Sequence, residues 1–137
     1  MLRVPLTSVA FPSTHSLMPS ELRFTKTKLL WSVLTVGRPD KASVMHYKQF
    51  ARFEMLYRWN MVQASLDFAS SHGWIYNSPA FQKFDPSEKG AINFFLGMVM
   101  AKLAADILLD TPWLIHASLF KALGGSAPLK AGKSCAD

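Results

Sequence analysis

The stretch from Asp85 to Asp110 constrains the fold most, because it predicts one long helix that is apolar on nearly every side. Asp85 is a natural N-cap, Pro86 suits the first helical position, and Glu88 follows three residues after the cap, as in a capping box. A helix that is apolar all round lies either at the centre of a hydrophobic core or in a membrane.

The charged residues inside this helix help to decide between a core helix and a membrane helix. Between residues 91 and 109 only Lys102 and Asp106 are charged. In a spanning helix each would cost roughly 2.5–3.5 kcal/mol, against about 0.3–0.6 kcal/mol gained for each large aliphatic residue. The sum for a lone span is close to zero or unfavourable, which favours a buried core helix and leaves a membrane helix as the alternative.

Two side-chain patterns on the same helix predict contacts. Gly97, Ala101 and Ala105 share one side and predict a flat strip against which a second backbone packs. Lys102 and Asp106 lie one turn apart and predict an ion pair on a solvent-facing stripe. The alternative is that Asp106 is buried, in which case it must be paired or have a raised pKa.

Residues Ser43 to His72 predict a second long helix with two opposed apolar faces. One face consists of Phe50, Phe53, Tyr57, Met61, Ala64 and Phe68, and the other of Met55, Trp59, Val62 and Leu66. A helix of this kind needs two neighbours.

A third, shorter helix is expected from Pro112 to Leu123, with Thr111 as its N-cap. The sequence therefore predicts a mainly α fold, a small bundle of about three helices (two long, one short) over residues 42–125. Residues 1–41 are expected to be a basic, poorly ordered leader, although a strand or a short helix would each fit residues 21–37. Residues 126–137 are expected to be a flexible tail.

The distribution of charge argues against a nucleic-acid partner. The chain carries a net charge of +6, but residues 1–41 hold six basic and two acidic side chains, whereas residues 42–123 hold seven basic and six acidic ones. The predicted helical domain is thus nearly neutral, and a solvated basic segment accounts for the excess.

Motifs that suggest catalysis fail on their context. Residues 127–134 resemble a phosphate-binding loop, yet no strand precedes them and only three residues follow, so the required helix cannot form. The single cysteine, Cys135, excludes an internal disulfide framework and a cysteine-based zinc site. None of the four histidines has a second ligand at helical spacing. We therefore predict no catalytic residue, no cofactor and no metal site.

The predicted function follows from an excess of apolar surface over what the predicted helices can bury against one another. Three helices cannot bury one helix that is apolar all round and another with two apolar faces, and exposed apolar surface marks interfaces. We expect a non-enzymatic interaction or oligomerisation module that binds itself or a larger protein through Met55, Trp59, Val62 and Leu66. The alternatives are a small membrane-associated helical protein and a helical fragment of a longer enzyme. The expected location is the cytoplasm, with a membrane second.

Overall fold

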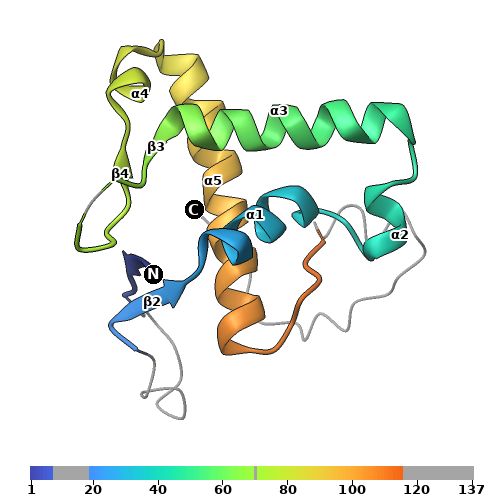
Figure 1. Cartoon of the computed structure of the whole chain (residues 1–137), viewed down its shortest axis with the longest axis horizontal. Coiled ribbons are helices and arrows are strands. Elements are labelled where there is room, and N and C mark those ends of the chain that lie inside the picture. Colours follow the sequence, from blue (N-terminus) through green and yellow to red (C-terminus); the bar gives the residue numbers. More distant parts are fainter. Residues whose placement is uncertain (8–18, 70, 116–137) are drawn as a thin grey trace, which may run out of the picture.

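A computed structural model describes residues 1–7, 19–69 and 71–115 and shows a mostly helical chain with a few short strands (Figure 1). In chain order the described elements are β1 (Leu2–Pro5), β2 (Glu21–Phe24), α1 (Lys26–Thr35), α2 (Lys41–Val44), α3 (Gln49–Ser65), β3 (Leu66–Asp67), β4 (Tyr76–Asn77), α4 (Pro79–Lys83) and α5 (Pro86–Leu108). The predicted helical class is confirmed, whereas the described residues form five helices rather than three.

Helix α5 begins where its local signals place it. Asp85 Oδ1 accepts hydrogen bonds from the backbone N–H groups of Ser87 (2.7 Å) and Glu88 (3.1 Å), and Glu88 Oε2 accepts one from Asp85 N–H (3.1 Å). Hydrogen bonds to the carboxylate, the strongest from the Ser87 hydroxyl, hold the pKa of Asp85 below its ordinary value. The predicted capping box is confirmed.

Helix α1 lies at the centre of the hydrophobic core. Thr25 caps it by accepting a hydrogen bond from Lys28 N–H at 3.1 Å, and Leu29 and Val33 are fully buried. The helix packs against both α3 and α5, where Val62 and Leu103 are also fully buried (Figure 1). The prediction that residues 1–41 form a poorly ordered leader is therefore wrong for the described part of that segment.

The strands ahead of α1 complete this correction. β1 and β2 pair antiparallel with Leu2 opposite Phe24, and the buried side chains of Leu2, Leu22 and Phe24 join the core. Arg3 N–H also donates to Gly73 O at 2.8 Å, which ties β1 to the loop ahead of β4. Segment 21–37 thus contains both a strand and a helix. Neither element is stable alone, and each is stabilised by packing on the rest of the chain.

The second predicted helix is divided and shortened. α2 ends at Val44, and α3 begins only after Lys48, whose φ of 51° is left-handed and breaks the helical path. α3 ends at Ser65 because Leu66 is extended and pairs with Asn77 of β4. The prediction of one helix from Ser43 to His72 is therefore wrong at both ends.

The third predicted helix is not present in its described part. Asp110 has a left-handed φ of 51°, and residues 112–115 continue as irregular backbone. Leu114 O accepts a hydrogen bond from Gly37 N–H at 3.2 Å, so this segment returns to the end of α1. The remainder of the predicted helix and the predicted tail at 126–137 lie outside the described residues.

Replacing Leu29 with Ala tests whether α1 belongs to the folded core. We expect the free energy of unfolding to fall by about 2–5 kcal/mol, because the change leaves a cavity between helices. Urea unfolding followed by circular dichroism measures this, with Thr27→Ala on the exposed side of α1 as the matched control. A Leu29→Ala variant as stable as the control would mean that α1 is a detachable leader.

Candidate interaction surface

The structure turns the predicted interface of α3 inward. Val62 is 0% exposed and Leu66 8% exposed, both within the hydrophobic core, and Trp59 is half-buried against that core. Met55 is also half-buried. The prediction that these four residues form a docking face is therefore corrected, because Val62, Leu66 and Trp59 pack in or against the core.

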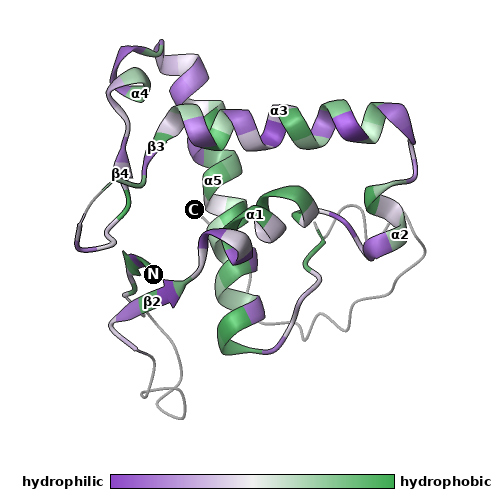
Figure 2. Ribbon diagram, in the orientation of Figure 1, coloured by the Kyte–Doolittle hydropathy of each residue, from purple (hydrophilic) through white to green (hydrophobic). Residues whose placement is uncertain are grey.

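The opposite side of α3 is exposed and aromatic. Phe50, Phe53 and Tyr57 are 67%, 68% and 68% exposed, and their spacing of three and four residues places them on one face of the helix. Leu56, 57% exposed, adjoins them. These four residues are called the outer face of α3 below. Figure 2 shows apolar and polar residues alternating along α3.

A charge network fixes α3 in this orientation. The Glu54 carboxylate is in contact with the guanidinium groups of both Arg38 and Arg58, and Arg58 also donates to Val36 O at 2.9 Å near the end of α1. Burial lowers the pKa of Arg58, while the charge of Glu54 opposes that shift. The half-buried Arg58 guanidinium thus bonds both a carboxylate and the end of α1, and these contacts set which side of α3 points outward.

Lys102 and Asp106 are both buried at the contact between α1 and α5, and not on a solvent-facing stripe as predicted. Lys28 of α1 provides the ion-pair contact to Asp106, with its Nζ 2.9 Å from Oδ2. The ammonium of Lys102, 0% exposed, has no hydrogen-bond partner among the described residues, and neither does the buried Ser32 hydroxyl. Burial lowers the pKa of Lys102, the charge of Asp106 opposes this shift, and Lys28 adds to it.

The small-residue strip of α5 is not a packing surface within the described chain. A Cβ added to Gly97 would meet no atom within 4 Å, and Ala101 is exposed. Ala105 is only partly buried. The prediction that Gly97, Ala101 and Ala105 receive a second backbone is therefore wrong for the part of the chain that the structure describes.

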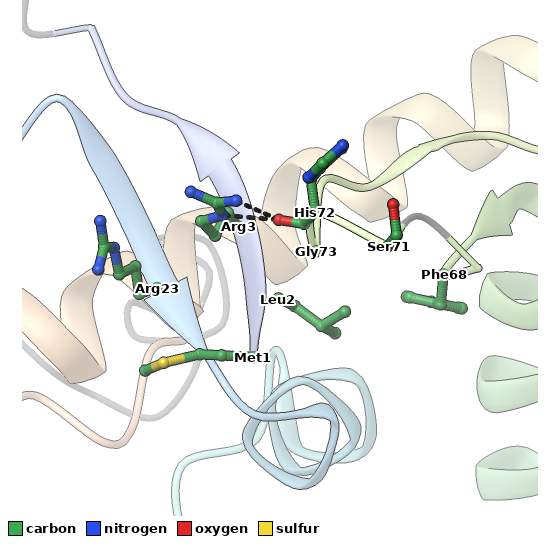
Figure 3. Close-up of a pocket in the computed structure, with 8 residues that line it drawn as sticks. All are labelled: Met1, Leu2, Arg3, Arg23, Phe68, Ser71, His72 and Gly73. Carbon is green, nitrogen blue, oxygen red and sulfur yellow. Dashed lines mark hydrogen bonds between the residues drawn. The ribbon is translucent and has the colours of Figure 1, made fainter.

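A pocket of about 360 Å³ lies where β1 and β2 meet the loop before β4 (Figure 3). Arg3 crosses its rim, with Nε donating to His72 O at 2.9 Å, and Arg23 is paired with Glu21. Figure 3 shows the Arg23 side chain on the far side of β1 from Ser71 and His72. Both guanidinium groups thus have partners within the chain, and the eight lining residues include no carboxylate.

Over residues 1–7, 19–69 and 71–115 no group of three or more His, Cys, Asp or Glu side chains is placed to hold a metal ion. The loop-like motif at 127–134, Cys135 and His116 lie outside the described residues. The outer face of α3 is thus the site that the geometry singles out.

The sequence contained a signal for this face that composition alone does not weigh. Tyr57 carries a hydroxyl that needs a partner when it is buried, whereas Val62 and Leu66 carry none. Of two apolar faces, the one with a tyrosine is the less suited to a core. The pairing of Lys28 with Asp106 had no comparable signal, because it depends on where α1 meets α5.

Replacing Lys102 with Met tests the buried ammonium. The unfolded chain holds this proton up to the ordinary lysine pKa and the folded chain releases it at lower pH, so burial penalises the folded state at neutral pH and the penalty fades as pH rises. We expect the Lys102→Met variant to be about 1–4 kcal/mol more stable at neutral pH, with the gap narrowing towards pH ~10.

Urea unfolding at a series of pH values measures this gap. Lys83→Met, at an exposed position of α4, is the matched control and should show no comparable stabilisation. A Lys102→Met variant that is less stable than the parent at every pH would mean that the fold compensates the charge of Lys102.

No family model, no curated protein and no solved structure matches this chain. What the protein can do is therefore inferred from the exposure, contacts and charges of its own residues.

Proposed function

We propose that this chain is a non-enzymatic helical interaction module that binds a protein partner through the outer face of α3. The observation that carries the proposal is the exposure of Phe50, Phe53 and Tyr57 by about two thirds each on a helix whose other side is buried in the core. Aromatic side chains at helical spacing are common anchors in helix-mediated recognition.

The size of this surface supports a specific contact. Each aromatic side chain can bury about 150–250 Å², so three that are two-thirds exposed offer on the order of 300–500 Å². A standard interface takes about 800 Å² from each partner. The aromatic residues thus supply about half of such a surface, and Leu56 with the neighbouring side chains would supply the remainder.

Rigidity supports it as well. The outer face sits on a regular helix that is anchored by core contacts and by the pairing of Glu54 with Arg38 and Arg58. Binding would therefore order few backbone groups, which lowers the entropic cost of association.

A membrane-associated protein is the second candidate, and the orientation of α5 favours it. Among the described helices, α5 alone is long and apolar enough to cross a membrane, and only 17% of its apolar window is buried. It turns Lys102 and Asp106 inward and Phe94 and Gly97 outward, and Figure 2 shows apolar residues along most of its length. Charged residues in membrane helices face the protein interior in this way.

Replacing Phe53 and Tyr57 with Glu tests the interaction module. We expect the tagged parent chain in a detergent-free cell extract to elute as a complex well above its own 15.3 kDa, and the double variant to elute as a monomer with unchanged helicity, because two buried charges oppose docking. Size exclusion with light scattering and circular dichroism give the two readouts.

Gln82→Glu with Asn93→Glu is the matched control, since it adds the same charge at exposed positions of α4 and α5. The proposal fails if the parent chain is monomeric in the extract or if both variants behave alike. A parent chain that sediments with membranes and leaves them only in detergent would favour the second candidate.

A further inference from the structure

The surface around the outer face of α3 is strongly basic. Residues 38–58 contain five basic and two acidic side chains. Lys41, Lys48 and Arg52 are exposed and take part in no ion pair with any described residue. Arg52 lies one turn before Leu56 on α3, and Lys48 directly precedes the helix. Positive charge thus borders the Leu56 edge of the outer face and the N-terminal end of α3.

The two acids in this segment do not offset that charge. Glu54 is held between the guanidinium groups of Arg38 and Arg58. Asp40 caps α2, where its Oδ1 accepts from Ser43 N–H at 2.8 Å. The first turn of α3 contains no acid, so its cations lie at the positive end of the helix dipole without internal compensation. An external acidic group would remove this cost.

Resting on the proposed function, we propose that the partner presents an acidic amphipathic helix. Its apolar residues at positions i, i+3, i+4 and i+7 would pack on Phe50, Phe53 and Tyr57, and its flanking carboxylates would face Lys48 and Arg52. Charge complementarity of this kind sets the orientation of a docked helix and speeds its association.

The charges also separate this partner from the alternatives. A second copy of the chain carries a net charge of +6 and would bring cations against cations. A membrane surface binds helices with a wide apolar face, whereas the outer face of α3 is flanked around the helix by the charged residues Arg52 and Glu54. A nucleic acid would match the cations but would leave Leu56 and the aromatic edges uncovered.

The test uses synthetic helical peptides and the full chain. One peptide carries leucine at i, i+3, i+4 and i+7 with flanking glutamates, a second replaces the glutamates with lysine, and a third keeps the glutamates but replaces leucine with serine. Fluorescence anisotropy measures their binding. We expect the first to bind more weakly as salt rises. The lysine peptide should bind about tenfold more weakly, since each of two exposed charge pairs contributes a factor of about 1.4–5. The serine peptide should also bind about tenfold more weakly or worse, because it loses the apolar burial of its leucines.

Charge reversal sharpens the result. Lys48→Glu with Arg52→Glu should make the lysine peptide the tighter ligand, whereas Lys83→Glu with Lys89→Glu, which changes the net charge equally at α4 and the start of α5, should leave the order unchanged. Circular dichroism of both variants shows whether helicity is kept.

Four outcomes would overturn the inference. Two concern the peptides: equal binding of the acidic and basic peptides, and binding of the serine peptide as tight as that of the leucine peptide. The third is a purified chain that forms a dimer abolished by Phe53→Glu. The fourth is tighter binding to anionic phosphatidylserine vesicles or to single-stranded DNA than to the acidic peptide. Charge reversal could leave the complexes in the cell extract intact while Phe53→Glu with Tyr57→Glu dissolves them. That result would contradict the proposed acidic partner but would still support the proposed interaction module.

Discussion

The burial of α1 between α3 and α5 is the contact on which the other elements depend. Leu29 and Val33 of α1 are fully buried beside Val62 of α3 and Val99 and Leu103 of α5. Without α1 the two longest helices would share only a small contact, as their crossing in Figure 1 shows. The antiparallel pair of β1 and β2 adds Leu2, Leu22 and Phe24 to the same core, so the N-terminal segment is part of the centre of the fold and not an appendage to it.

This arrangement also decides which side of α3 is free. Arg58 reaches the carbonyl group of Val36 at the end of α1 and holds Glu54 beside it. With that edge of the helix fixed, Val62 and Leu66 must point into the core, and Phe53 and Tyr57 must point away from it. The exposed aromatic surface is thus a consequence of how α1 and α3 are joined, and the exposed basic residues come from α2 (Lys41), the turn after it (Lys48) and the start of α3 (Arg52).

The sequence predicts those parts of the structure that depend on local interactions. The start of α5 follows from Asp85, Pro86 and Glu88, whose capping contacts need no other part of the chain. The end of α3 does not, because Leu66 leaves the helix to pair with Asn77, and such a pairing is decided by tertiary contacts. The role of α1 was missed for the same reason, since ten residues gain stability only from the surfaces they pack on.

At the site, too, a feature that depends on tertiary contacts could not be predicted from the sequence: which of the two faces of α3 is exposed. Periodicity predicts both apolar faces of α3, but only the position of α1 determines which of them is buried. The sequence pattern therefore led to the face of Met55, Trp59, Val62 and Leu66. The exposed face is the opposite one. Tyr57 was the one local indication. The contact of Lys28 with Asp106 was missed for the same reason, because Lys28 comes from a distant part of the chain.

Helix α5 reverses the usual arrangement of a surface helix, and this bears on what covers the protein. Its two mid-helix charges face α1, while Phe94, Gly97 and Ala101 face outward. Burying Lys102 without a hydrogen bond costs free energy that an ordinary soluble helix would avoid by rotating the charge into water. That rotation would expose Val99 and Leu103, which share the buried stripe with Lys102, and would break their contact with α1. The core contact of α1 therefore fixes α5 with its charges inside, and the apolar surface that remains outside is a second area that a partner or a membrane can cover.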